Sequence, residues 1–142
     1  MLAHLKKWTV GALAAFALAA SGSAYSAPKT VLVVGDSLSA EYGLTRGSGW
    51  VALLDQKLKA EKLDARIVNA SISGDTTSGG RSRLPALLAQ HKPSVVVLEL
   101  GANDGLRGLP VASAEDNLRA MIELSRQNKA KVLLVGIHMP AN

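Results

Sequence analysis

The sequence predicts an α/β protein in which a parallel sheet lies between two layers of helices. Short runs of β-branched and aliphatic residues alternate along the chain with stretches whose leucines recur at helical spacing. The 142 residues are enough for one domain, and no internal repeat or low-complexity linker interrupts the alternation. Strands that alternate with helices are joined by right-handed crossovers, which make the strands parallel.

The first half of the domain contains two predicted strands and one predicted helix. Residues 30–34 (TVLVV) form a continuous apolar run that ends at Gly35, as is typical of a strand buried on both faces. Residues 66–69 (RIVN) are a second strand. Between them, four apolar residues at helical spacing predict a helix over about 48–63: Trp50, Leu53, Leu54 and Leu58.

The next helix and strand are marked by leucines and then by valines. Leu84, Leu87 and Leu88 indicate a helix that should contain Pro85 in its first turn and end at residues 91–93 (HKP). Residues 94–100 (SVVVLEL) form the third and most apolar predicted strand.

The last predicted helix begins with a capping box. Residues 113–116 (SAED) fit that motif, and Leu118, Met121 and Ile122 then share one helical face. Residues 131–137 (KVLLVGI) are the fourth predicted strand.

Polar, glycine-rich segments follow the first three predicted strands. They are residues 35–39 (GDSLS), 71–77 (SISGDTT) and 101–105 (GANDG). In open parallel sheets, ligands bind outside the carboxyl ends of the strands. We therefore expect these three loops to converge on one edge of the sheet and to form the functional site.

Each loop offers one group suited to acyl chemistry. Ser37 offers a hydroxyl at a strand-to-helix turn, beside the N-termini of two helices whose N–H groups stabilise an oxyanion. Gly74 has no Cβ to obstruct close approach of its N–H to a reacting carbonyl oxygen, and Asn103 offers a side-chain amide to the same oxygen. Singly, each fits a turn or cap residue. Their occurrence after three successive strands favours a shared site.

Nucleotide-binding motifs do not match these loops. Residues 74–79 (GDTTSG) precede a helix as a phosphate-binding loop would, but Gly80 and Arg81 stand where that motif needs Lys and Ser or Thr. The first loop lacks the G-x-G-x-x-G fingerprint of dinucleotide-binding proteins. Ser39 also stands where the nucleophile elbow of α/β-hydrolases requires Gly.

The formal charge of +5 does not favour nucleic acid as a partner. Lys6 and Lys7 lie in a predicted leader that contains no acid, so removing them leaves +3. The other basic residues alternate with acids, as on solvated helices, and a 4% aromatic content leaves few side chains for base stacking.

The absence of cysteine excludes disulfides and thiolate sites.

Residues 1–26 are predicted to be a signal peptide that directs the protein to the periplasm or outside the cell. Lys6 and Lys7 precede an apolar run over 8–20 and a tail of small residues. The run is shorter than the roughly 20 residues of a membrane span. Cleavage after Ala24 or Ser26 would leave the domain at about 27–142 with no membrane span; an uncleaved anchor is the alternative.

The three loops resemble the conserved blocks of the SGNH (GDSL-type) hydrolases. The matching segments are residues 35–39, 69–76 and 101–104. Two further segments resemble one bacterial group in particular, the periplasmic thioesterases, lysophospholipases and arylesterases: residues 84–88 and 98–101. The resemblance covers residues 30–142.

This resemblance implies a serine hydrolase that cleaves small carboxylic esters or acyl thioesters. Ser37 would form an acyl-enzyme, and no metal or organic cofactor would be needed. The backbone N–H groups of Ser37 and Gly74 and the amide of Asn103 would hold the oxyanion. The alternative from another class is a non-catalytic acyl- or glycan-binding module on the same fold.

The sequence departs from that family's pattern in its histidines. The family's base is the His of a later Asp-x-x-His block, but none of His4, His91 and His138 has Asp three positions before it. His4 lies in the leader, His91 should end a helix, and His138 does not match the catalytic position. We expect that the sequence stops before the catalytic Asp and His, and that this polypeptide is weak or inactive because a serine without a base stays protonated.

Overall fold

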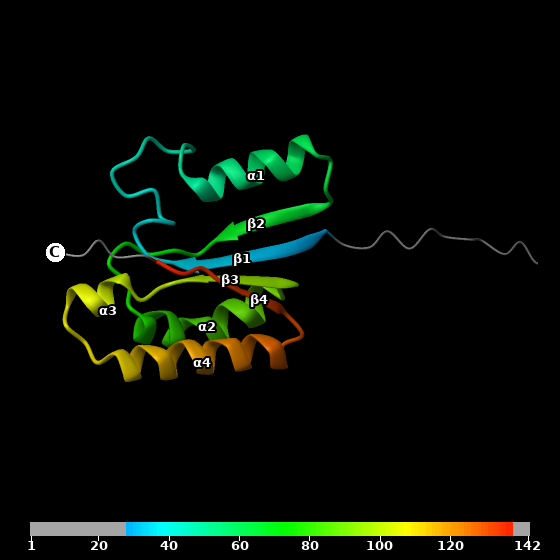
Figure 1. The fold of residues 1–142 in the computed structure, drawn as a ribbon. Coiled ribbons are helices and arrows are strands. Elements are labelled where there is room, and N and C mark those ends of the chain that lie inside the picture. The colour runs from blue at the N-terminus through cyan, green and yellow to red at the C-terminus, as the bar shows by residue number, and fades with distance from the viewer. Residues whose placement is uncertain (1–27, 138–142) are drawn as a thin grey trace, which may run out of the picture.

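In the computed structural model, residues 28–137 are described, and they form a parallel sheet with helices on both faces (Figure 1). The predicted signal peptide and His138 lie outside the described residues. The sheet has the strand order β2-β1-β3-β4. Its strands are β1 (Lys29–Gly35), β2 (Ala65–Asn69), β3 (Val95–Glu99) and β4 (Lys131–Leu134). The predicted α/β fold is confirmed.

The middle of the sheet is formed by β1, which pairs in parallel with both β2 and β3. Val31 lies opposite Ile67 on one side and Val95 on the other. Leu32, Val33 and Val34 are completely buried. This burial on both faces is what the unbroken apolar run predicts for an inner parallel strand.

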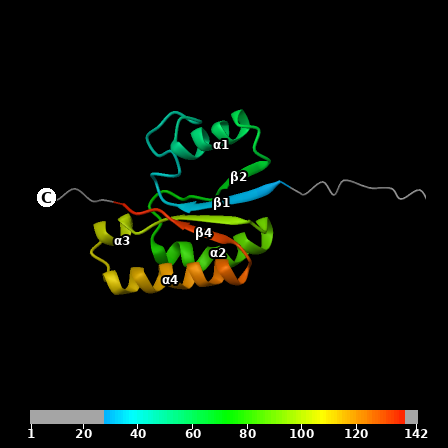
Figure 2. The same ribbon diagram turned by 45° about the vertical axis from the view of Figure 1, so that its right-hand side comes forward.

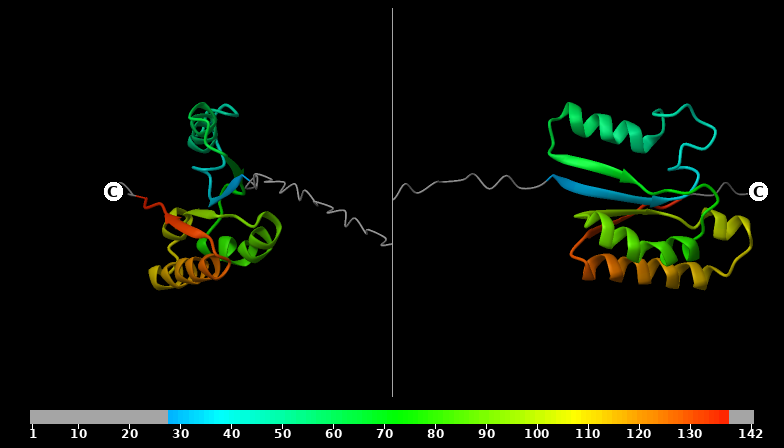
Figure 3. Two further views of the ribbon diagram at one scale, coloured as in Figure 1. Left: turned by 90° about the vertical axis from the view of Figure 1, so that its right-hand side faces the viewer. Right: turned by 180° about the vertical axis from the view of Figure 1, so that it is seen from behind.

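Helices cover the two faces of the sheet unequally (Figures 2 and 3). Helix α1 (Trp50–Ala60) lies on one face, and α2 (Thr77–His91) and α4 (Val111–Gln127) pack side by side on the other. The short helix α3 (Ala102–Leu106) follows β3.

Two apolar clusters hold these layers together. Alternate residues of β1 and β3 point to α2 and α4, where they meet Leu84, Leu88 and Met121. The intervening residues, Val33 and Val97, meet Val51 of α1. The period-two alternation of the strands thus divides their side chains between the two helical layers.

The start of α2 differs from the sequence prediction. The helix begins at Thr77, so Pro85 lies in its interior rather than in its first turn. Thr76 caps the helix by accepting a 3.2 Å hydrogen bond from the Gly79 N–H to its Oγ1. The first two turns consist mainly of Gly, Ser and Arg, so no apolar spacing marked them in the sequence.

The boundaries of other helices and strands also differ from the sequence prediction. Helix α4 begins at Val111 with Pro110 as its N-cap, so the predicted capping box at Ser113 is wrong. Residues 135–137 do not continue β4, although the Val135 N–H still donates to the Leu98 carbonyl oxygen at 2.9 Å. The predicted helix over 48–63 is confirmed in a shorter form.

Candidate active site

The three polar loops meet at the carboxyl ends of β1, β2 and β3, as expected. The side-chain amide of Asn103 donates to the Asp36 carboxylate (Nδ2 to Oδ2, 3.2 Å) and to the Asp75 carbonyl oxygen (2.8 Å). The Ile72 N–H donates to the Gly35 carbonyl oxygen at 3.0 Å. One amide therefore joins the third loop to the residues that flank Ser37 and Gly74 in the sequence.

Ser37 is half-buried in the first of several consecutive turns after β1. The neighbouring Asp36 is 1% exposed, and its carboxylate also accepts the Leu38 N–H at 3.0 Å. The Ala40 N–H donates to the Asp36 carbonyl oxygen at 2.9 Å, which gives the segment a helix-like turn. These bonds fix the main chain on both sides of Ser37.

The surroundings of Ser37 differ from the predicted strand-to-helix turn. Helix α1 begins only at Trp50, after a series of turns and loop residues. The first N–H of α2, that of Thr77, donates to the Asp104 carboxylate at 2.9 Å and so is already engaged. Ser37 is therefore followed by turns and not directly by a helix, and the first N–H of α2 is held by Asp104.

Gly74 has a backbone conformation that favours glycine, with φ of 80°. A Cβ there would lie 3.6 Å from the Arg107 Nη2 atom, so space alone does not require glycine. The Arg107 guanidinium donates to the Gly74 carbonyl oxygen at 2.6 Å. Next along the chain, Asp75 forms an ion pair with Arg83 at 2.8 Å. The glycine is thus held by contacts on its C-terminal side.

Asn103 lies in the first turn of α3, a helix that the sequence did not indicate. The adjacent Asp104 is 4% exposed and accepts both the N–H and the hydroxyl of Thr77, at 2.9 and 2.5 Å. The Asn117 side chain of α4 donates to the same hydroxyl at 3.1 Å. The third loop is therefore anchored to the start of α2 and to α4.

A second buried network, which no sequence pattern indicated, lies beneath the first loop. The Ser39 hydroxyl donates to Glu99 Oε2 at 2.7 Å and accepts the Trp50 indole N–H at 3.2 Å. Glu99 is 3% exposed; burial raises the pKa of its carboxyl, the Ser39 hydrogen bond opposes this rise, and the charge of Asp36 adds to it. The signal available in the sequence was a single acid, Glu99, within the apolar run over 94–100.

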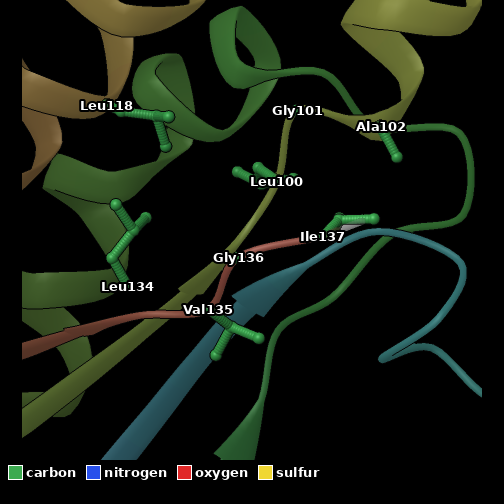
Figure 4. Close-up of a pocket in the computed structure, with 8 residues that line it drawn as sticks. All are labelled: Leu100, Gly101, Ala102, Leu118, Leu134, Val135, Gly136 and Ile137. Atoms are coloured by element: carbon green, nitrogen blue, oxygen red, sulfur yellow. The ribbon is translucent and has the colours of Figure 1, made fainter. Parts of the chain in front are cut away.

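Two apolar pockets lie beside the loops. One has a volume of about 250 Å³ (Figure 4) and is lined by Leu100, Gly101, Ala102, Leu118, Leu134, Val135, Gly136 and Ile137. The other, of about 380 Å³, is lined by Leu38, Trp50, Glu99, Val135, Gly136 and Ile137. The second pocket is lined in part by Leu38, the residue that follows Ser37 in the sequence.

The part of the chain that the structure describes contains neither a cluster of metal-binding side chains nor a membrane-spanning helix. Within residues 28–137, no three His, Asp or Glu side chains are grouped so that they share a metal ion. No helix in this range combines the length and apolar character needed to cross a membrane. His91 is the last residue of α2, at the opposite end of the helix from the second loop.

Known proteins resemble this chain over most of its described length. The model of the GDSL-like lipase/acylhydrolase family matches residues 33–142. Esterase TesA of Pseudomonas aeruginosa is 57% identical over 117 residues, which cover 82% of this chain and 58% of that protein. The thioesterase 1/protease 1/lysophospholipase L1 of Escherichia coli K12 is 46% identical over 117 residues, which cover 82% of this chain and 55% of that protein.

The fold agrees with a solved relative. The crystal structure of the psychrotrophic esterase EstA from Pseudoalteromonas sp., inhibited by monoethylphosphonate, matches with a TM-score of 0.76 at 49% identity. The match covers 80% of this chain and 62% of that one. This chain therefore spans less than two thirds of the length of these relatives. The sequence match, the parallel sheet and the meeting of the three loops agree, and the chain belongs to the GDSL-like lipase/acylhydrolase family.

Proposed function

We propose that the protein is a serine hydrolase that cleaves small carboxylic esters or acyl thioesters, with Ser37 as its nucleophile. The observation that carries this proposal is the double hydrogen bond of Asn103, which reaches Asp36 at 3.2 Å and Asp75 at 2.8 Å. Those two residues flank Ser37 and Gly74, so a hydroxyl and three potential N–H donors come from one small region. The names of the relatives, esterase and thioesterase/lysophospholipase, support the same substrate class.

In the proposed reaction, Ser37 Oγ attacks the acyl carbonyl carbon and gives up its proton to a base. The C–O or C–S bond then breaks, the alcohol or thiol leaves with a proton, and water hydrolyses the resulting acyl-enzyme. The N–H groups of Ser37 and Gly74 and the Asn103 amide would stabilise the oxyanion. Removal of one such donor typically lowers kcat by about 10²–10³-fold.

Asn103 would exchange a hydrogen-bond partner during this reaction. Both amide hydrogens are engaged in the present structure, one to Asp36 and one to Asp75. The bond to Asp36 is the longer of the two at 3.2 Å, so we infer that it is the one replaced by the oxyanion. The shorter bond would keep the side chain aimed at the site.

The base is not supplied by an Asp-x-x-His block within these 142 residues. A serine hydroxyl without an adjacent base is a weak nucleophile. We therefore expect this polypeptide to turn over esters slowly, with the chemistry still dependent on Ser37. We also propose export to the periplasm or beyond, since Lys6, Lys7 and the apolar run that follows resemble a signal peptide. No cofactor or nucleic-acid partner is included in the proposal.

Hydrolysis of p-nitrophenyl butyrate with added imidazole tests this function, because imidazole can replace a missing base. We expect a slow rate that rises with imidazole and falls to background in Ser37→Ala. Ser48→Ala is the matched control, since within residues 28–137 its exposed hydroxyl bonds only to the Thr45 carbonyl oxygen. A rate that is unchanged in Ser37→Ala contradicts the proposal.

Mass spectrometry after incubation with an activated phosphonate ester gives an independent measurement. We expect one phosphonyl group on Ser37 in the parent polypeptide and in Ser48→Ala, and none in Ser37→Ala. A polypeptide that binds decanoate but shows neither labelling nor Ser37-dependent hydrolysis would instead be the acyl-binding module.

A further inference from the structure

We propose that Glu99 is a positioning residue for the nucleophile: through Ser39 it holds the turn that carries Ser37 against the end of β3. This inference rests on the proposed function of Ser37. It adds a role for a buried acid in β3 that takes no part in the proposed chemical steps.

The contact between Glu99 and Ser39 is short and shielded from water. The Ser39 hydroxyl lies 2.7 Å from Glu99 Oε2, and the two residues are 0% and 3% exposed. Ser39 also accepts the Trp50 indole N–H at 3.2 Å, and its carbonyl oxygen accepts the Asn69 side-chain amide at 2.8 Å. A residue two positions after the nucleophile is therefore bonded to β3, α1 and β2 at once.

Close packing at the end of β1 shows that the contact is tightly constrained. Gly35 pairs with Glu99 across the sheet. A Cβ on Gly35 would lie 2.6 Å from Ser39 Oγ and 2.9 Å from Glu99 Oε2. Real Cβ atoms essentially never lie this close to another heavy atom. An added methyl group at Gly35 would therefore force the side chains of Ser39 and Glu99 to move. The glycine before Asp36 thus leaves room for the hydrogen bond beneath the turn.

The main chain transmits this anchoring to Ser37. Asp36, on one side, is held through its carboxylate by the Leu38 N–H and the Asn103 amide. Ser39, on the other side, is held by Glu99. The Ser37 carbonyl oxygen itself accepts only the Tyr42 N–H among the described backbone bonds, at 3.2 Å. The position of Ser37 is therefore set by its two anchored neighbours.

The charge state of Glu99 matters because a second carboxyl is close. Asp36 is the charged group that faces it, and the remaining members of the network, Ser39, Trp50 and Asn69, are neutral. Burial raises the pKa of Glu99, and the charge of Asp36 adds to this rise. In the described part of the chain, Glu99 Oε1 has no hydrogen-bond partner. At a pH where it is protonated, Glu99 accepts the Ser39 hydrogen bond without placing a second negative charge next to Asp36.

Trp50 provides a spectroscopic reporter of this network. The chain has two tryptophans, and in a Trp8→Phe background Trp50 is the only one left. We expect its emission to change as pH rises above 4.5, the ordinary pKa of Glu, because ionised Glu99 repels Asp36 and loosens the turn. In Glu99→Gln, which keeps an acceptor but cannot ionise, the emission should remain at its low-pH value throughout.

The second readout is the rate of phosphonate labelling at Ser37 in the same background. Glu99→Leu, which keeps the bulk but loses the acceptor, should label about tenfold more slowly, as expected for the loss of one buried hydrogen bond. Glu99→Gln should restore labelling to within about twofold of the parent. Glu123→Gln, an exposed acid on α4, is the matched control and should change neither readout.

The outcomes separate this inference from the function on which it rests. A parent polypeptide that shows no labelling at Ser37 even with added imidazole refutes the proposed function. A parent that is labelled, together with a Glu99→Leu variant labelled equally fast, refutes the positioning role. If Glu99→Leu does not fold, Ser39→Ala replaces it, since it removes the same hydrogen bond with a smaller change in volume. Persistence of the Trp50 transition in Glu99→Gln would also overturn the proposal.

Discussion

Replacement of Asp104 by Asn tests whether a single carboxylate fastens the third loop to α2. Asp104 is 4% exposed and accepts two hydrogen bonds from Thr77, one from the N–H at 2.9 Å and one from the hydroxyl at 2.5 Å. Asn has almost the same shape, but one of its two terminal atoms is a donor. It can therefore accept only one of these bonds, and its NH₂ group faces the other donor.

The expected decrease in the free energy of unfolding follows from the two interactions that are lost. A buried donor left without a partner costs about 1–3 kcal/mol. The loss of a negative charge at the N-terminus of a helix adds about 0.3–1 kcal/mol. We therefore expect Asp104→Asn to lower the free energy of unfolding by about 1–4 kcal/mol. Asp116→Asn, an exposed change on α4, should lower it by no more than about 0.5 kcal/mol.

Urea unfolding followed by circular dichroism measures these differences. Thr77→Val removes the hydroxyl and keeps the backbone N–H, so a double-mutant cycle with Asp104→Asn isolates the coupling between the two side chains. We expect a coupling energy of about 1–2 kcal/mol, within the range for residues in direct contact. An Asp104→Asn variant as stable as Asp116→Asn would refute the reasoning.

Three further predictions concern the core, the second loop and the acid response. Leu84→Ala, at a completely buried position, should lower the free energy of unfolding by about 2–5 kcal/mol in urea, and a loss below about 1 kcal/mol would contradict its place in the main cluster. Gly74→Ala should cost only about 1–2 kcal/mol, because φ is 80° while no atom obstructs a Cβ; a much larger loss would indicate a steric clash instead. The pKa of Glu41 is lowered by hydrogen bonds from the Gly47 and Gly49 N–H groups, so its stabilisation is present above pH 4.5 and is lost as pH falls through the lowered pKa. Glu41→Gln should therefore reduce the loss of stability in acid, and an unchanged urea midpoint-versus-pH curve would show that these bonds contribute nothing.

The inner strands and the meeting of the loops were predictable because their causes are local or general. Residues 31–34 are apolar without interruption, and only a strand covered on both faces requires that pattern. Parallel strands also end at the same edge of a sheet, so the polar segments after β1, β2 and β3 had to lie near one another. The bonds of Asn103 to Asp36 and Asp75 confirm that part of the expectation.

Two of the features that escaped prediction depend on partners distant in the sequence. Thr77 begins α2 with the help of Asp104, which lies 27 positions later, and nothing near Thr77 signals that contact. Ser39 and Glu99 are separated by 60 positions. Pro110 is the N-cap of α4, and the spacing of Ser113 and Asp116, which resembles a capping box, lies inside the helix. Local patterns therefore located every described strand and every described helix except α3, whereas a tertiary contact sets the start of α2.

The central place of β1 has a consequence for how the molecule assembles during synthesis. Val31 leaves the ribosome long before Val95, the residue beside it in β3. The strand that leads into the Ser37 turn is therefore made first, yet it remains unpaired on one edge until more than sixty further residues have been added. Contacts so far apart along a chain slow folding, since a long loop must close before they form. A nascent chain halted before β3 would present an aliphatic strand with one unpaired edge. The turn around Ser37 would then lack the hydrogen bond between Ser39 and Glu99.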